Sequence, residues 1–321
     1  MARFRTYLAL LGSATALAAG VPAPAQSAGA RAAATAEYRW VALGDSYTAG
    51  GIPATGEVYE SPRDGCERTD QSYPRIIHRA LGPLVDLTDV SCAAATIENV
   101  TSKAQQPNGR HLPPYSEDPD YPFPPVPAQA EAVGPGTDVI TVGVGGNSLG
   151  FDIVGRCLLL GEGSKGAGTP CRDELAAGVP GRLAAVADEY GRMLGALRAR
   201  APHARILAVG YPTVVPEDTS RCRYGDLRQF GSVTPGDLDW LRRDVLGPLD
   251  TAIEKSADGH GASFVDLSAS SRRHSVCDTD QWVEGILDHD GRPALVHPNA
   301  EGQRNAAAHV ASALLNAVGH G

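Results

Sequence analysis

The chain has 321 residues, of which 20% are charged, and its formal net charge is −9 at pH 7. This acidic balance argues against nucleic acid or an anionic membrane as the main partner, because both carry negative charge. Aromatic residues make up only 6% of the chain, which argues against a tryptophan-rich platform for carbohydrate.

The N-terminus has the pattern of a secretory signal peptide. Arg3 and Arg5 supply positive charge, residues 7–21 are mostly apolar, and the small residues and prolines that follow offer several cleavage points. The apolar stretch is short for a membrane span and is interrupted by glycine and serine, which favours cleavage over anchoring. No later segment is apolar enough to cross a bilayer, so we expect a secreted, extracellular protein. The expected parts are a signal peptide at 1–30, a flexible segment at 31–37 and a single domain at 38–321.

Short apolar runs alternate with helix-like segments along the rest of the chain. Strands are predicted at 40–43, 85–90, 139–144, 206–211 and 263–267. Helices are predicted at 72–81, 182–200, 237–255 and 300–318. This alternation is typical of a parallel sheet that is covered by helices on both faces. We therefore predict an α/β protein with a three-layer α/β/α sandwich.

Two segments are predicted to be irregular. Residues 107–127 are rich in proline, aspartate and tyrosine, and residues 161–168 are rich in glycine. Long irregular loops in compact domains are often functional, although a clamped surface loop would have a similar sequence. Cys157 and Cys171 flank the second segment, which favours the clamped loop there.

All six cysteines follow the predicted signal peptide. An even number of cysteines in an exported chain indicates disulfides, and six cysteines allow 15 pairings. The chain has neither a CxxC pair nor an HExxH segment, which argues against zinc or thioredoxin chemistry. We expect no metal site.

Four polar segments are expected to meet at one edge of the sheet. Ser46 follows the first strand, residues 91–96 follow the second, and Asn147 follows the third. His297 precedes the last helix. Ligands of open parallel sheets bind beyond the carboxyl ends of the strands. Ser46 by itself fits a helix N-cap as well as a nucleophile, and its distant partners decide in favour of the nucleophile.

These segments resemble the motifs of the SGNH (GDSL) hydrolase family. The similarity is to Gly-Asp-Ser-Tyr at 44–47, to Gly-Gly-Asn at 145–147 and to His-Pro-Asn at 297–299, in the family's order. Further segments at 89–92, 210–212 and 215–219 are similar to secreted actinomycete esterases and lipases. The resemblance implies a flavodoxin-like fold and hydrolysis of carboxylic esters without a metal or organic cofactor.

The resemblance also assigns roles to single residues. Ser46 would be the nucleophile, and His297 would be the base that takes its proton. The oxyanion would be bound by the Asn147 side-chain amide and the backbone N–H of Ser46. The family's third donor is a glycine N–H, and Ala94 stands at that position in this chain. The N–H survives this exchange if the alanine tolerates the local backbone conformation.

The residue three before the histidine also departs from the family's pattern. The family often has an aspartate there, whereas this chain has Ala294. The imidazole still needs an acceptor for its second N–H. We predict that the backbone carbonyl of Ala294 orients His297, which gives a Ser–His dyad. Asp288 and Asp290 are the alternative acceptors nearby in sequence.

The family resemblance also suggests how the cysteines pair. Secreted members often carry three sequential disulfides. These would be Cys66–Cys92, Cys157–Cys171 and Cys222–Cys277.

A competing nucleophile is Ser148. Residues 146–150 match the GxSxG elbow of α/β-hydrolases, and Asp266 and His297 would complete the order of a triad. Gly145 and Gly146 intervene between the strand and Ser148, however, whereas the elbow serine normally follows directly on the strand, and Ser46 would then have no role. Ser46 is therefore the preferred assignment.

The leading hypothesis is a secreted serine esterase or lipase that acts on lipid, fatty-acyl or other alkyl esters and works as a monomer. The alternatives are a polysaccharide O-deacetylase with the same chemistry and a non-catalytic extracellular binding protein that kept the fold. The loop at 107–127 is expected to influence the preferred chain length of the substrate.

Overall fold

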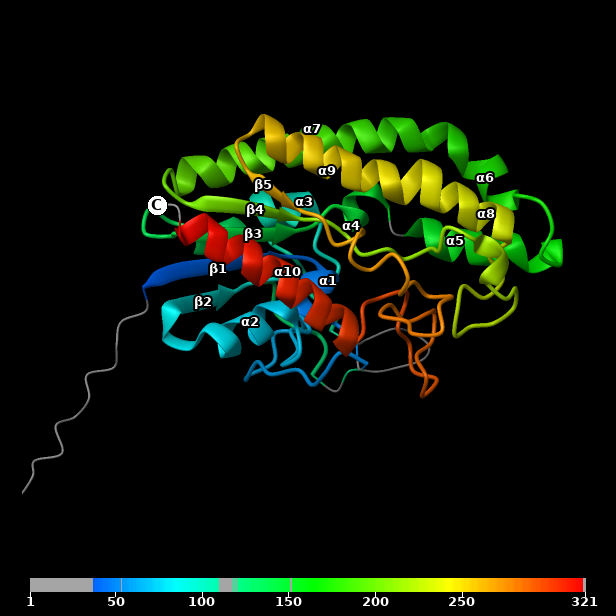
Figure 1. The fold of residues 1–321 in the computed structure, drawn as a ribbon, viewed down its shortest axis with the longest axis horizontal. Coiled ribbons are helices and arrows are strands. Elements are labelled where there is room, and N and C mark those ends of the chain that lie inside the picture. Colours follow the sequence, from blue (N-terminus) through cyan, green and yellow to red (C-terminus); the bar gives the residue numbers. More distant parts are fainter. Residues whose placement is uncertain (1–36, 53, 110–117, 119, 151, 320–321) are drawn as a thin grey trace, which may run out of the picture. The chain divides into compact units, whose positions relative to one another are not determined.

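The predicted apolar runs form strands of one parallel sheet. The computed structural model describes residues 37–52, 54–109, 118, 120–150 and 152–319. Its five strands lie in the order β2-β1-β3-β4-β5, and all neighbouring pairs are parallel (Figure 1). The strands are β1 (Tyr38–Gly44), β2 (Val85–Asp89), β3 (Val139–Gly143), β4 (Arg205–Val209) and β5 (Ser263–Val265).

Helices cover both faces of this sheet, so the predicted three-layer α/β/α fold is confirmed (Figure 1). The α-helices are α1 (Ser46–Ala49), α2 (Tyr73–Leu81), α3 (Ile97–Thr101), α4 (Gly146–Leu149), α5 (Asp152–Gly161), α6 (Pro170–Leu175), α7 (Val179–Arg200), α8 (Pro235–Trp240), α9 (Gly247–Gly259) and α10 (Ala300–Gly319). The short 3₁₀ segments are η1 (Gly82–Leu84), η2 (Gln129–Ala132), η3 (Glu162–Ser164), η4 (Ala176–Gly178) and η5 (Thr219–Arg221), and η6 (Leu241–Leu246) is a π-helix.

Alternate residues of β1, β3 and β4 enter two separate hydrophobic cores. Val41 and Leu43 of β1 pack in the core that also contains residues of α3, α7 and α9. Trp40 and Ala42 of the same strand pack in the core that contains residues of α2 and α10. This follows from the geometry of a strand, whose successive side chains point to opposite faces. Burial on both faces explains why these three strands are mostly apolar along their whole length.

Several helix and strand limits differ from the prediction. The segment predicted as one helix at 237–255 consists of α8, the π-helix η6 and α9. β4 ends at Val209 instead of residue 211, and the backbone N–H of Tyr211 donates to the Asp250 carboxylate at 2.9 Å. A side-chain acceptor from a distant helix thus takes the place of a strand partner, which a local pattern cannot reveal.

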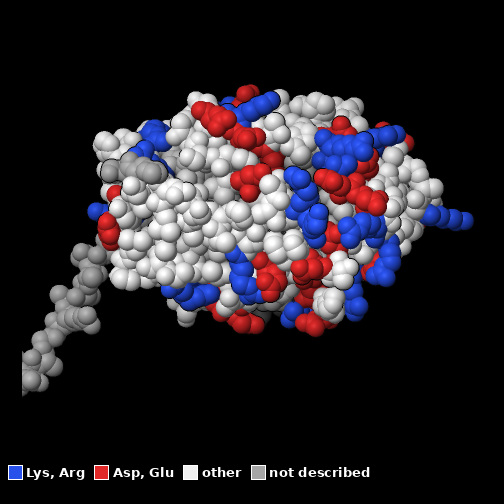
Figure 2. All heavy atoms as spheres, in the orientation of Figure 1, with Lys and Arg blue, Asp and Glu red and all other residues white. Residues whose placement is uncertain are grey.

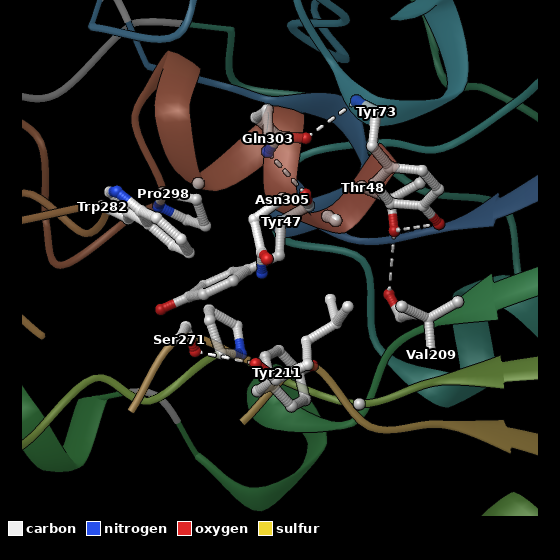
Figure 3. A pocket seen from close by; sticks show the side chains of 16 residues that line it. Tyr47, Thr48, Tyr73, Val209, Tyr211, Ser271, Trp282, Pro298, Gln303 and Asn305 are labelled. Carbon is white, nitrogen blue, oxygen red and sulfur yellow. Dashed lines mark hydrogen bonds between the residues drawn. The ribbon is translucent and has the colours of Figure 1, made fainter. Parts of the chain in front are cut away.

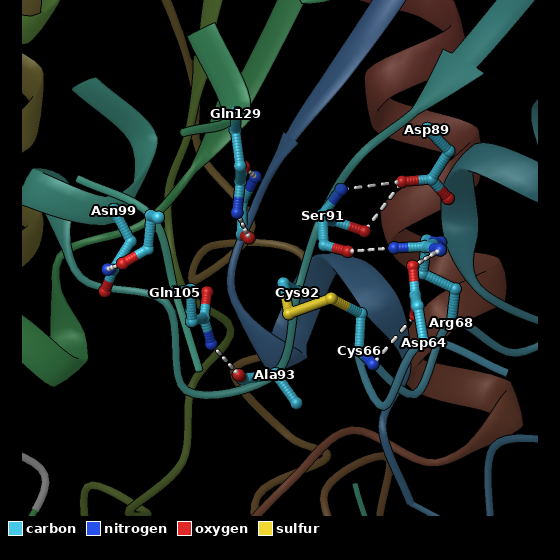
Figure 4. Close-up of a disulfide and its surroundings, with 12 residues drawn as sticks. Asp64, Cys66, Arg68, Asp89, Ser91, Cys92, Ala93, Asn99, Gln105 and Gln129 are labelled. Atoms are coloured by element: carbon cyan, nitrogen blue, oxygen red, sulfur yellow. Dashed lines mark hydrogen bonds and ion pairs between the residues drawn. A yellow bond between two sulfur atoms is a disulfide. The ribbon is translucent and has the colours of Figure 1, made fainter. Parts of the chain in front are cut away.

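Three disulfides join the cysteine pairs that the family resemblance implies: Cys66–Cys92, Cys157–Cys171 and Cys222–Cys277. The first connects the loop after α1 to the turn after β2 (Figure 4). Arg68 lies beside it, where its guanidinium donates to the Ser91 carbonyl at 3.0 Å and pairs with Asp64 at 2.6 Å. The disulfide and the hydrogen bond from Arg68 thereby hold together two segments that follow neighbouring strands.

The predicted signal peptide lies outside the described residues, as do residues 110–117 and 119 of the predicted irregular segment. At the base of that segment, Gln105 and Val126 exchange backbone hydrogen bonds of 2.9 and 2.8 Å. No helix in the described part of the chain is long and apolar enough to cross a membrane. On the face shown in Figure 2, acidic and basic side chains are interspersed.

Candidate active site

The ends of β1 and β3 place the candidate site at the point where the strand order reverses. β1 lies between β2 and β3, so the chain leaves the sheet in opposite directions on either side of this point. Gly44 ends β1, and a Cβ there would lie 2.6 Å from the Gly143 carbonyl oxygen and 2.2 Å from Thr48 Oγ1. Only glycine allows the chain to turn this tightly into α1. Buried Gln129 bonds both the N–H and the carbonyl of Gly44, at 2.8 and 2.9 Å.

The structure brings Ser46 and His297 together although 251 residues separate them. Ser46 Oγ lies 2.7 Å from His297 Nε2. On the other side of the ring, Nδ1 lies 3.0 Å from the Ala294 carbonyl oxygen and 2.9 Å from that of Leu295. Because carbonyl oxygens only accept hydrogen bonds, Nδ1 carries the proton of the neutral ring. Nε2 is then free to accept the serine proton.

The loop before His297 is held in an unfavourable backbone conformation. Leu295 and Val296 have φ angles of 50° and 65°, a region that non-glycine residues rarely adopt. Such conformations cost about 1–2 kcal/mol for each residue. The Tyr47 hydroxyl donates to the Val296 carbonyl at 2.5 Å, and the Tyr47 ring lies 4.8 Å from the imidazole. The strained loop therefore aims two carbonyl oxygens at Nδ1, and a residue next to the serine anchors it.

The two aspartates considered as alternative acceptors have other partners. The Asp288 carboxylate is buried and receives the Arg292 Nε–H at 2.7 Å. It also receives the backbone N–H groups of Asp290 and Arg292. The Asp290 carboxylate lies on the surface, 3.0 Å from the Arg292 guanidinium. Arg292 thus holds both carboxylates, and the Ala294 carbonyl occupies the predicted position at the histidine.

Burial changes the acid–base behaviour of this site. His297 is 9% exposed, and burial lowers the pKa of its imidazole to about 4, because the charged form loses its hydration. The Leu295 and Ala294 carbonyls act in the opposite direction. Burial also raises the pKa of the Asp45 carboxyl to about 6, while hydrogen bonds from the Tyr211 hydroxyl and the Tyr47 N–H oppose the rise. The histidine is consequently neutral, as a base must be, over most of the pH range.

The family resemblance assigns three donors to the oxyanion, and two of the residues that carry them, Ser46 and Asn147, line one small cavity with His297. The backbone N–H groups of Ser46 and Ala94 donate to no acceptor within the described residues. The Asn147 side-chain amide donates one of its two N–H groups to the Ala95 carbonyl at 3.0 Å, which fixes the amide's orientation. Its second N–H has no acceptor within the described part of the chain. Donors of this kind can stabilise a negatively charged oxygen.

The alanine at the third donor position adopts the backbone conformation that glycine favours. Ala94 has a φ angle of 65° and an exposed side chain. Alanine reaches this left-handed region at a modest cost, so the N–H keeps its direction. The neighbouring N–H groups of Ala93 and Ala95 are used within the structure, by the carbonyls of Cys66 and Cys92.

The competing nucleophile has a structural role. Ser148 Oγ accepts the backbone N–H of Ile97 at 2.9 Å, so it helps to cap α3. The Asp266 carboxylate receives the N–H groups of Ser268 and Ala269 in a local turn. His297 Nε2 bonds Ser46 instead. The geometry therefore favours Ser46 over Ser148.

An apolar cavity begins beside these residues. Tyr47, Gly146 and Val296 line it, and each is the chain neighbour of one of Ser46, Asn147 and His297. The cavity holds about 720 Å³ of empty space, part of it open to solvent. The rest of its lining is mainly aliphatic: Leu149, Ile153, Val154, Val214, Val215, Leu241, Val245, Leu246 and Leu249. Tyr47 and Tyr211 also border a second, narrower cavity, together with Trp282 and Pro298 (Figure 3).

The comparisons with known proteins agree with this geometry. The model of the GDSL-like lipase/acylhydrolase family matches residues 42–304. The chain belongs to this family. It is 34% identical to lipase 2 of Streptomyces coelicolor, over 91% of this chain and 90% of that protein. It is 31% identical to an esterase of Streptomyces scabiei, over 91% of this chain and 88% of that protein.

Solved structures show the same fold. A phospholipase A1 from Streptomyces albidoflavus superposes with a TM-score of 0.63 at 22% identity, over 86% of this chain and 99% of that one. An extracellular lipase from Streptomyces rimosus has the same TM-score and identity, over 87% of this chain and 99% of that one. As a member of the GDSL-like family, the protein is a carboxylic ester hydrolase of the esterase or lipase type.

Sequence reasoning did not identify the residues that support this site. Tyr47 and Tyr211 stand within segments that match the family, but these motifs alone assign them no role. Gln303 of α10 donates to the Tyr47 carbonyl at 2.9 Å and accepts the Tyr73 N–H at 2.8 Å (Figure 3). The sequence signal for Gln303 is its position on the buried face of an amphipathic helix. No group of three or more His, Cys, Asp or Glu side chains that could hold a metal occurs in the described part of the chain.

Replacing Asn147 with alanine should lower kcat on a short-chain ester by about 10²–10³-fold, because it removes one oxyanion donor. Ala94→Gly is the matched control, since it keeps the backbone N–H and removes only a methyl group from the same region. Its kcat should stay within about threefold of the wild-type value. Steady-state kinetics on p-nitrophenyl acetate measures both. A loss of less than tenfold for Asn147→Ala would contradict the assignment.

The acid limb of the kcat/KM profile should lie near pH 4. Only neutral His297 can accept the serine proton, and its lowered pKa keeps it neutral well below pH 6.5. Asp288→Asn is the control, and its limb and plateau should match the wild type, because Asp288 binds Arg292. Circular dichroism should accompany the assay, so that acid unfolding is recognised. A midpoint at or above 6.5, or a large loss of turnover in Asp288→Asn, would refute the proposed dyad.

Proposed function

We propose that the protein is a secreted serine esterase or lipase that hydrolyses carboxylic esters through an acyl-serine intermediate. The observation that carries the proposal is the 2.7 Å contact between Ser46 Oγ and His297 Nε2, with Asn147 lining the same small cavity. In this proposal Ser46 is the nucleophile and His297 is the general base and acid. The Ala294 carbonyl orients the ring, and Ser46, Ala94 and Asn147 bind the oxyanion.

In the first half of the reaction, Ser46 Oγ attacks the carbonyl carbon of the ester while its proton moves to His297 Nε2. The carbonyl oxygen becomes negatively charged, and the backbone N–H groups of Ser46 and Ala94 and the Asn147 amide stabilise it. His297 then gives its proton to the departing alkoxide oxygen, and the C–O bond breaks. The alcohol leaves, and the acyl group remains on Ser46.

In the second half, a water molecule takes the place of the alcohol. His297 removes a proton from it, and the resulting oxygen attacks the acyl carbon. The same donors stabilise the second tetrahedral intermediate, which collapses as His297 returns the proton to Ser46 Oγ. The carboxylic acid is released. The Nδ1–H bond to the two carbonyls keeps the ring in one orientation throughout both halves.

The shape and chemistry of the neighbouring cavity support an acyl or alkyl chain as the substrate's apolar part. The cavity starts at Tyr47, Gly146 and Val296 and continues between aliphatic side chains of α5, η6 and α9. Burial of each methylene there would contribute about 0.8 kcal/mol. The mainly aliphatic lining offers few partners for the hydroxyl groups of a sugar, which favours lipid or fatty-acyl esters over a polysaccharide.

Three features support secretion. The first 30 residues have the composition of a signal peptide. All six cysteines are paired in disulfides, which persist in oxidising compartments. The solved relative from Streptomyces rimosus is described as extracellular.

Ser46→Ala should abolish hydrolysis of p-nitrophenyl butyrate, whereas Ser148→Ala should retain most of it, because Ser148 Oγ only receives the Ile97 N–H. An alkyl fluorophosphonate probe should label the wild type and Ser148→Ala at Ser46. Intact-protein and peptide mass spectrometry measures the labelling. Loss of activity in Ser148→Ala with retention in Ser46→Ala would overturn the assignment, and an unlabelled wild type would favour a binding protein.

Val154→Trp should shorten the preferred acyl chain. Val154 of α5 lines the apolar cavity and is partly exposed, so the larger tryptophan side chain can fill the entrance of the cavity. Turnover of p-nitrophenyl acetate should change little, while kcat/KM for the octanoate should fall by about tenfold or more, because about 1.4 kcal/mol corresponds to tenfold. Leu159→Trp on the same helix is the control, since Leu159 is 73% exposed. Equal losses for both esters would contradict an acyl site in this cavity.

A further inference from the structure

Tyr211 lies where the nucleophile turn and the oxyanion turn approach each other. It follows β4, and its side chain reaches past the end of β3 to the end of β1. Its hydroxyl donates to Asp45 Oδ2 at 2.6 Å and accepts the backbone N–H of Gly146 at 2.8 Å. A single phenol oxygen therefore connects two segments whose residues neighbour Ser46 and Asn147.

Both partners of this hydroxyl are N-terminal groups of short helices. Asp45 is the N-cap of α1, and its Oδ1 accepts the Tyr47 N–H at 2.9 Å. Gly146 begins α4, and its N-cap, Gly145, has no side chain that could accept a hydrogen bond. The first N–H groups of a helix need acceptors from outside the helix. The Tyr211 hydroxyl is such an acceptor for the first N–H group of α4.

The chemistry of the phenol suits this double role. Burial and the Asp45 carboxylate raise the pKa of Tyr211 well above its ordinary value, so the hydroxyl keeps its proton. It can then donate to a carboxylate and accept from an amide at the same time. The distance of 2.6 Å to Asp45 is typical of a hydrogen bond to a charged acceptor. The Tyr211 N–H bond to Asp250 and the edge contact with the Tyr47 ring, at 5.1 Å, hold the residue in place.

We propose that Tyr211 is a positioning residue, whose hydroxyl joins the N-cap of α1 to the first residue of α4 and thereby sets the Asn147 donor relative to the Ser46 nucleophile. This inference rests on the proposed function for its catalytic consequence. Rigid placement of an oxyanion donor matters for the rate, because a misplacement of about 1 Å can cost about 10²-fold. In this proposal Tyr211 acts through Asp45 and Gly146 and does not touch the reacting atoms.

Tyr211→Phe tests the proposal, because it removes the hydroxyl and keeps the ring. Its kcat on p-nitrophenyl acetate should fall by about 10–100-fold while KM stays within about threefold, since the loss falls on the transition state. Tyr190→Phe is the matched control: it removes another buried hydroxyl, which donates to the Val142 carbonyl at 3.3 Å. Its kcat should change by less than threefold.

A double mutant separates positioning from general destabilisation. In an Asn147→Ala background the donor to be positioned is absent, so Tyr211→Phe should lower kcat by less than about threefold further. An unreduced loss in that background would overturn the proposal. If Tyr211→Phe does not fold, Asp45→Asn is the second variant. The asparagine side chain would present an N–H donor to the Tyr211 hydroxyl in place of the carboxylate oxygen that accepts its hydrogen bond. This variant should show the same reduced effect in the Asn147→Ala background, and full additivity would overturn the proposal.

Amide hydrogen exchange tests the contact without any catalytic readout. The peptide that covers residues 144–150 should exchange faster in Tyr211→Phe than in the wild type or Tyr190→Phe, because the Gly146 N–H loses its acceptor. Unchanged exchange would overturn the proposal even if the enzyme is active. A different result would overturn the proposed function, namely hydrolysis of esters by Ser46→Ala at the wild-type rate.

Discussion

The hydrogen bond between Ser46 and His297 depends on a loop that the rest of the molecule holds in a strained conformation. Leu295 and Val296 both have positive φ angles, and this turns the carbonyls of Ala294 and Leu295 toward the imidazole. Without these acceptors the ring would have no fixed orientation and Nε2 would not face the serine. The Tyr47 hydroxyl and backbone bonds from Ala294 and Val296 to the segment at 285–286 offset the strain.

Neutral carbonyls at the histidine have consequences for its chemistry. A carboxylate would stabilise the imidazolium and raise the pKa, whereas here burial dominates and the pKa falls to about 4. The base is therefore weak but almost always unprotonated. In the proposed mechanism, stabilisation of the transition state then depends more heavily on the proposed oxyanion donors, and this gives weight to the hydrogen bonds that hold Asn147 and the turn before it.

Much of the fold was predictable, because it follows from local patterns. The five apolar runs are strands, and the amphipathic segments at 72–81, 182–200 and 300–318 are helical. The segment at 237–255 was predicted with the correct type but without its π-helical part. The support from Tyr211 was not predictable, since its hydroxyl partners lie 166 and 65 residues away. A hydrogen bond between distant segments leaves no periodic pattern in the sequence.

The sequence by itself determined the family, the parallel sheet and the order of the motifs, because strand patterns and short motifs are local properties. It also placed Ser46, Asn147 and His297 at expected strand and helix ends. Only the tertiary structure decided that Ser46 rather than Ser148 faces the histidine, and that Asp288 binds Arg292. These outcomes depend on which atoms come within hydrogen-bond distance once the strands are paired and the two cores are packed.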